Sequence, residues 1–203
     1  MSGPTSFEQL VNQALVRIGY PEYIGNIYDG TKQAAAALIA YGQTRDQFLR
    51  TDDFDFAERN LTLTLLKQAP DGGYIPPNVW GPQYPALPWL FEYAYPIDCL
   101  KVRSVRQQAI FVMNFDPQPN VFSITNDDSY SPAKKVILCN VPSAILTYTA
   151  QIVDLTTWEP DAIEAFVAAL AQRLSVALDR TTALKLAVQE EQALTAIAEK
   201  EQG

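Results

Sequence analysis

The spacing of apolar residues changes twice along the chain, and this change limits the possible folds more than any other feature. Up to residue 52 the apolar residues recur at helical intervals, and from about residue 54 to 153 they alternate with polar residues as in half-buried strands. Helical spacing returns after Trp158. We therefore predict an α+β protein with a helical bundle formed by N- and C-terminal helices and an antiparallel β region inserted between them.

Helical segments are predicted over residues 5–19 and 31–50, the first ending at Gly19 where a C-terminal cap belongs. In the second, Leu38 is predicted on the same apolar face as Ala34 and Tyr41. A third helix begins near Pro160, and thin apolar spacing predicts a further helical arm toward the C-terminus. The domain prediction is a helical bundle domain with a C-terminal arm, residues 1–52 and 156–203, and an inserted β domain, residues 53–155.

The β domain contains a segment rich in proline and aromatic residues. Residues 67–90 hold six prolines and three glycines, which predicts an extended loop. Its aromatic side chains favour packing against a partner protein, and they are Tyr74, Trp80, Tyr84 and Trp89. Strands are predicted in the rest of the domain, at residues 90–96, 100–106, 121–125, 134–139 and 144–153.

Composition limits the chemistry. The chain has no histidine, which excludes Ser–His–Asp and Cys–His nucleophile systems. The cysteines Cys99 and Cys139 are far apart and have no zinc-site spacing. A net charge of −8 argues against a protein that neutralises nucleic-acid phosphates. We expect a non-catalytic protein without a cofactor or metal, made in the cytoplasm because no secretory or membrane-spanning segment is evident.

Acidic side chains leave two alternatives open. Asp52, Asp53 and Asp55 have the oxygen ligands that a divalent cation or a carboxylate-based cell-wall or polysaccharide hydrolase requires. The hydrolase requires two acids that face each other across a cleft. The favoured interpretation of Asp52, Asp53 and Asp55 is instead that they lie at a solvated helix end. The other alternative, a β-sandwich binding module, requires an exposed aromatic groove.

Four stretches, residues 10–24, 29–63, 92–105 and 144–178, resemble one protein family in the same order. The features that carry the resemblance are an Ile18-Gly19 helix end, a Tyr95-Pro96-Ile97-Asp98-Cys99-Leu100 turn between strands and a Trp158-Glu159-Pro160 helix start. Together they are similar to the head-to-tail adaptor (connector) proteins of tailed phages, including the tail tubular protein A group of short-tailed phages.

The resemblance implies a structural virion protein of the neck or tail. Such a subunit forms a ring, commonly of twelve copies, below the portal protein, joins it to the tail nozzle and continues the DNA channel. DNA passes without specific binding, and no membrane is involved. A portal-docking arm is implied at Leu184, Val188, Leu194 and Ile197. Contact with the nozzle or a neighbouring subunit is implied for Tyr74, Trp80, Tyr84 and Trp89. Candidate channel-lining acids, which would repel DNA phosphates, are Asp161, Glu164, Glu190 and Glu191.

Overall fold

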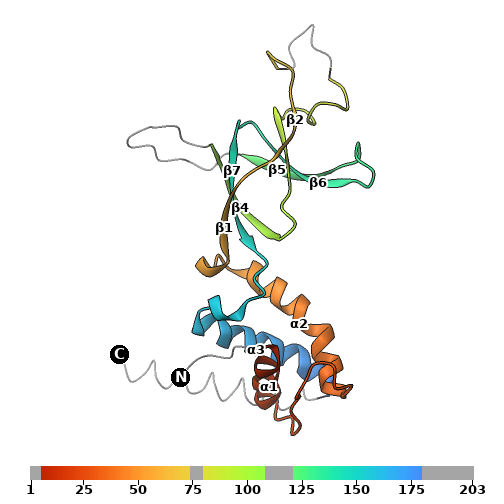
Figure 1. Cartoon of the computed structure of the whole chain (residues 1–203), viewed down its shortest axis with the longest axis vertical. Coiled ribbons are helices and arrows are strands. Elements are labelled where there is room, and N and C mark those ends of the chain that lie inside the picture. Colours follow the sequence, from red (N-terminus) through yellow and green to blue (C-terminus); the bar gives the residue numbers. More distant parts are fainter. Residues whose placement is uncertain (1–5, 74–79, 108–120, 180–203) are drawn as a thin grey trace, which may run out of the picture. The chain divides into compact units, whose positions relative to one another are not determined.

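The computed structural model describes residues 6–73, 80–107 and 121–179 (Figure 1). The chain divides into two compact units. One unit joins Met1–Asp52 with Ile152–Gly203, and the other is Asp53–Gln151. None of the helices in the described ranges has the length and hydrophobicity of a membrane-spanning segment.

The helical unit contains α1 (Phe7–Arg17), α2 (Lys32–Thr51) and α3 (Pro160–Ala177), with a short 3₁₀ turn, η2 (Leu155–Thr157), before α3. Ser6 and Gln9 form a capping box that begins α1 by satisfying free backbone N–H groups. Gly19 follows that helix with a φ of +63°, a conformation that glycine adopts without steric cost. Local caps therefore set the helix ends.

An aromatic cluster lies in the largely aliphatic core of the helical unit. Both α1 and α2 pack on α3 (Figure 1), and Phe166 of α3 is fully buried. Its ring lies 5.4 Å from the rings of Tyr41 and Trp158, and Phe48 stacks on Trp158 at 5.9 Å. These ring contacts join the N-terminal helices to the segment that returns after the strands.

The β unit consists of two antiparallel sheets. The first has the order β1-β7-β4 and the second the order β2-β3-β6-β5. A 3₁₀ turn, η1 (Asp55–Ala57), precedes β1. The strands are β1 (Glu58–Thr62), β2 (Leu65–Gln68), β3 (Phe91–Ala94), β4 (Cys99–Gln107), β5 (Phe122–Asp127), β6 (Lys134–Cys139) and β7 (Ala144–Ala150).

The chain changes from the first sheet to the second between β1 and β2. The N–H of Leu63 still donates to the carbonyl oxygen of Ala144, the first residue of β7, at 2.9 Å. Thr64 O, in contrast, accepts from the N–H of Ala94 at the end of β3, also at 2.9 Å. The buried Tyr93 of β3 donates from its hydroxyl to Val141 O at 2.7 Å, in the segment that links β6 to β7. Backbone hydrogen bonds therefore mark the first crossing, and a side-chain hydrogen bond from Tyr93 holds the segment at the second.

The predicted arrangement of the fold is wrong. The structure is α+β, but its described residues hold three α-helices and two separate antiparallel sheets, and strands dominate the middle of the chain. They do not form a bundle of N- and C-terminal helices around a single β insert. The physical reason is that sheet membership depends on pairings distant in sequence, such as Thr62 with Ile145 and Gln68 with Phe91. The predicted C-terminal arm lies outside the described residues.

Candidate binding pocket

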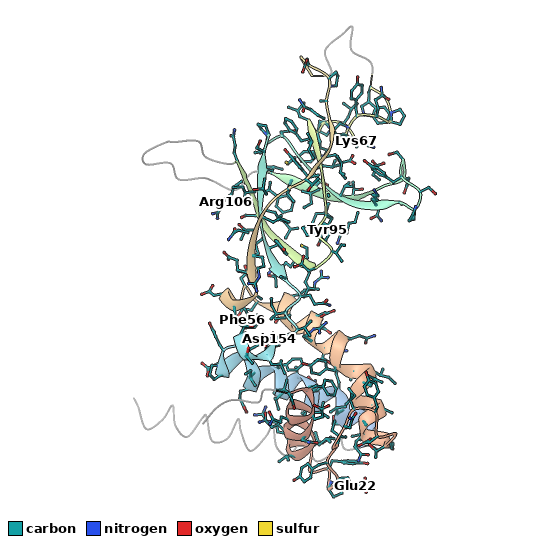
Figure 2. All side chains as sticks on the ribbon, in the orientation of Figure 1. Glu22, Phe56, Lys67, Tyr95, Arg106 and Asp154 are labelled. Atoms are coloured by element: carbon teal, nitrogen blue, oxygen red, sulfur yellow. The ribbon has the colours of Figure 1, made fainter. Side chains whose placement is uncertain are left out.

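A pocket of about 380 Å³ lies on the second sheet of the β unit. Lys67 of β2, Glu92 of β3 and Leu138 of β6 are cross-strand neighbours in the register of this sheet and line its floor. Figure 2 labels Lys67 on its strand. The end of β5 and the following turn contribute polar groups at residues 125–129, and the segment at residues 80–86 contributes the aromatic wall.

The ammonium group of Lys67 lies among carboxylates. Its side chain is 10% exposed, and its Nζ forms an ion pair with Asp127. Nζ also donates to Ser129 Oγ at 2.7 Å and lies 3.8 Å from Glu92 Oε2. The ring of Tyr130 is 5.0 Å away. The Lys67 ammonium group therefore lies close to Asp127 and Ser129 and farther from Glu92.

Glu92 is the most unusual residue of the pocket. It is 2% exposed, and its Oε1 has no hydrogen-bond partner among the described residues. Burial raises the pKa of Glu92 to about 7, with a further rise from the hydrogen bond and negative charge of Asp127 and an opposing effect of Lys67. The hydrogen bond with Asp127 favours the protonated form of Glu92, so this carboxyl group exchanges its proton near neutral pH.

Asp127 titrates in the opposite direction. Burial acts to raise its pKa, but hydrogen bonds from Lys67 and Ser129 outweigh burial and lower the pKa to about 2. One of these bonds comes from the backbone N–H of Ser129 to Asp127 Oδ1 at 2.8 Å. The pocket thus holds one carboxyl group that is ionised at all ordinary pH values beside one that titrates near neutrality.

The aromatic wall leaves a ring surface open. Trp80 is 48% exposed, and its Nε1 donates to Pro85 O at 2.8 Å. Because the polar atom of the indole is bonded within its own loop, the exposed remainder is apolar ring. Tyr84 is half-buried beside it and lines the same pocket.

Several chemical uses of these groups can be compared. In the described parts of the chain, no cluster of three or more His, Cys, Asp or Glu side chains is arranged to hold a metal ion, and in this pocket Glu92 and Asp127 pair with Lys67. Glu92 and Asp127 have the separated pKa values typical of an acid and base pair. However, both carboxylates approach the one ammonium group of Lys67, whereas glycosidase carboxyls lie roughly 5–9.5 Å apart and leave that space for sugar or water.

The acidic residues singled out in the sequence lie elsewhere. Asp52, Asp53 and Asp55 are all exposed. Asp53 bonds to Lys101 at 2.8 Å and lies 3.4 Å from Arg103, and the Lys101 bond lowers its pKa. It therefore faces basic side chains rather than a second acid.

The residues suggested by the family resemblance are distributed over both units. Trp80 and Tyr84 line the pocket, and Trp89 is half-buried near it in sequence. Asp161 is exposed in the first turn of α3, and Glu164 pairs with Arg17 at 2.5 Å. The remaining positions lie outside the described residues: Tyr74, Leu184, Val188, Glu190, Glu191, Leu194 and Ile197.

Sequence reasoning missed Lys67, Glu92 and Asp127 as a group. Lys67 is the first residue of the predicted proline-rich loop and Asp127 lies just after a predicted strand, so neither local pattern indicates a shared site. The one available signal was Glu92 itself, a charged residue within the apolar run that forms β3.

No protein-family model matches the sequence, and no curated protein shows significant similarity to it.

Proposed function

We propose that the chain is a structural subunit of a phage head-to-tail adaptor, which forms a ring below the portal, joins it to the tail and continues the DNA channel. The observation that carries this proposal is the outer face of α2, defined by Ala35, Leu38, Ile39 and Gly42. These residues follow i, i+3, i+4 and i+7 spacing, so they form one stripe along the helix.

α2 is apolar on two faces. Ala34, Ala37 and Leu49 are buried within the helical unit. On the outer face Leu38 is 51% exposed and Ile39 is 74% exposed. The sequence predicts Leu38 on the buried face, but Ala34 and Ala37 occupy that face and Leu38 is exposed to solvent. A helix that is apolar on a second, exposed face is typical of a protein that packs against another molecule.

The shape of the outer face suits a second helix or a neighbouring subunit. A side chain built on Gly42 would meet no atom within 4 Å, so the backbone is open at that end of the stripe. Small residues flanking two aliphatic ones allow another backbone to approach closely. In a ring of identical subunits, such a lateral contact is required of every copy.

Further features agree with the proposal. The Trp158-Glu159-Pro160 element lies at the start of α3, and the Tyr95–Leu100 motif spans the turn from β3 into β4, where the resemblance implies them. Ile97 in that turn is fully exposed. The net charge of −8 suits a channel that DNA passes without adhering.

Replacement of Ile39 tests the proposal. In Ile39→Asp the fold is retained, because the side chain is exposed, but self-association is lost, because a carboxylate cannot be buried in an apolar contact. Sedimentation velocity over a concentration series, with electron microscopy of the concentrated protein, measures weak association or rings. Val153→Asp is the matched control, since Val153 is an exposed aliphatic residue of the same unit, 67% exposed.

We expect the wild-type chain and Val153→Asp to associate alike and Ile39→Asp to be monomeric with an unchanged circular dichroism spectrum. A wild-type protein that stays monomeric at every concentration and fails to form rings would contradict the proposal. Native mass spectrometry that finds a tightly bound small ligand in place of association would also contradict it.

The Glu92–Asp127 pair favours a second candidate, a carboxylate-based polysaccharide hydrolase. Glu92 is the proton donor and Asp127 the base in that alternative, as their pKa values of about 7 and about 2 require. Turnover of cell-wall polysaccharide that is abolished by both Glu92→Gln and Asp127→Asn would support the hydrolase. Both carboxylates are engaged by the ammonium group of Lys67 rather than facing an open gap, so we expect no turnover.

A further inference from the structure

We infer that the pocket beside Glu92 binds an organic cation on an apolar stem, the chemistry of an arginine or lysine side chain. This inference is independent of the proposed ring, because it depends only on residues of the β unit. Three properties carry it, namely an unsatisfied buried acceptor, an excess of carboxylates and an open aromatic ring at the pocket wall.

The unsatisfied acceptor is Glu92 Oε1. When Glu92 is ionised, a buried carboxylate oxygen without a donor is costly, so Oε1 is open to a donor from a bound ligand. Lys67 does not supply that group, because its Nζ bonds to Asp127 and Ser129 and reaches only Glu92 Oε2, at 3.8 Å. A ligand that brings an N–H donor to Oε1 would complete the site.

The charges of the pocket select a cationic donor. Three carboxylates line it, those of Glu92, Asp127 and Asp128, against the single ammonium of Lys67. A neutral donor such as a sugar hydroxyl would satisfy Oε1 but leave the excess negative charge. A guanidinium or ammonium group satisfies both, and charge-assisted bonds are the stronger ones.

The walls match the rest of such a ligand. The exposed ring of Trp80 is placed for a cation–π contact, since its N–H is already bonded to Pro85 O. Leu138, Pro82 and Ala86 provide apolar surface for an aliphatic stem. The volume of about 380 Å³ lies in the range of small-ligand sites.

Binding is coupled to a proton. Glu92 faces Lys67 from β2, Asp127 from β5 and Tyr130 from the turn that follows β5. Of these, Asp127 remains ionised and Tyr130, whose pKa is raised, remains neutral across the neutral range. A cation displaces the Glu92 proton to solvent, so affinity falls as the pH drops below about 7. If only ionised Glu92 binds, the loss between about pH 7 and pH 5 is about 50-fold.

Titration with N-acetyl-arginine amide tests the site. The indole N–H signal of Trp80 in NMR spectra is the local reporter, and a dissociation constant on the order of 1 mM is expected for so small a probe. The isosteric but neutral N-acetyl-citrulline amide and the sugar N-acetylglucosamine are the comparison ligands. Glu92→Gln and Trp80→Leu are the pocket variants, the latter followed by calorimetry, and Glu159→Gln on the helical unit is the matched control.

We expect the arginine probe to bind wild-type protein and Glu159→Gln equally, with proton release near pH 6, and to bind Glu92→Gln at least tenfold more weakly without proton release. Trp80→Leu also weakens binding. Equal binding of citrulline and arginine amides, selective binding of the sugar, or arginine binding unaffected by Glu92→Gln would each overturn the inference.

A second copy of this chain and a separate cationic ligand are both possible sources of the cation. If Glu92→Gln weakens self-association in sedimentation experiments as well as arginine binding, the cation belongs to a neighbouring copy. If self-association is unchanged while arginine binding is lost, the cation comes from another molecule. Loss of association in Ile39→Asp with intact arginine binding separates this site from the proposed ring contact.

Discussion

The titration of Glu92 makes a quantitative prediction for the stability of the β unit. Its pKa is about 7 in the folded protein and 4.5 when unperturbed, because burial and Asp127 disfavour the ionised form. The folded state therefore retains a proton that the unfolded state has lost between these two values. Stability is highest below about pH 4.5 for this group and falls as the pH rises to about 7.

The size of the effect follows from the shift. A rise of the Glu92 pKa from 4.5 to about 7 corresponds to about 3 kcal/mol of unfolding free energy, and the side chain is only 3% exposed, so screening by solvent reduces it little. In Glu92→Gln the titrating group is absent. The variant should therefore gain about 3 kcal/mol relative to the wild-type protein as the pH rises from about 4.5 to about 8.

Urea denaturation across this pH range measures the difference between the two proteins. Fluorescence of Trp80 and Trp89 in a Trp158→Phe background confines the signal to the β unit. Asp127 does not interfere, because its pKa of about 2 is far below the range. Glu159→Gln should track the wild-type curve. A difference between Glu92→Gln and the wild-type protein that is constant with pH would refute the reasoning, since it would show that Glu92 is ionised throughout.

Two further substitutions test the same unit by urea denaturation. Lys67→Met leaves the carboxylates of Glu92 and Asp127 without their cation and should cost about 3–5 kcal/mol near pH 8, and less near pH 4.5 where Glu92 is protonated; an equal cost at both pH values would contradict this. Tyr93→Phe removes the hydroxyl that donates to Val141 O in the core and should cost about 1–3 kcal/mol, whereas a cost near zero would mean that another donor replaces it.

The elements of this fold were predictable wherever a local signal sets them. Gly19 ends α1 through its positive φ, and Pro160 begins α3 because its fixed φ suits the first helical turn. The alternation through Leu61, Leu63 and Leu65 correctly indicates extended chain. It gives no sign that the chain leaves one sheet and joins the other at Leu63, because partners in both sheets come from distant strands.

The pocket was not predictable for a related reason. Lys67 and Asp127 are 60 residues apart, and nothing in either local sequence indicates that they meet. The aromatic residues Trp80 and Tyr84 were identified as contact residues, but the acidic floor beneath them comes from strand pairing. Glu92 lies in a run that is otherwise apolar, and one buried acid in a strand does not identify its partners.

The effects of Glu92→Gln on stability and on binding of the arginine probe together distinguish a ligand site from a structural ion pair. In a structural pair, removal of one charge leaves its partner uncompensated and destabilises the protein. In this pocket Lys67 is not left without a partner when Glu92 is replaced, because its ion pair with Asp127 remains. The substitution removes only the longer contact between Lys67 Nζ and Glu92 Oε2. Glu92→Gln should therefore be more stable than the wild-type protein near pH 8 while it loses the arginine probe. A residue that costs stability at neutral pH and improves binding has the energetics of a functional site.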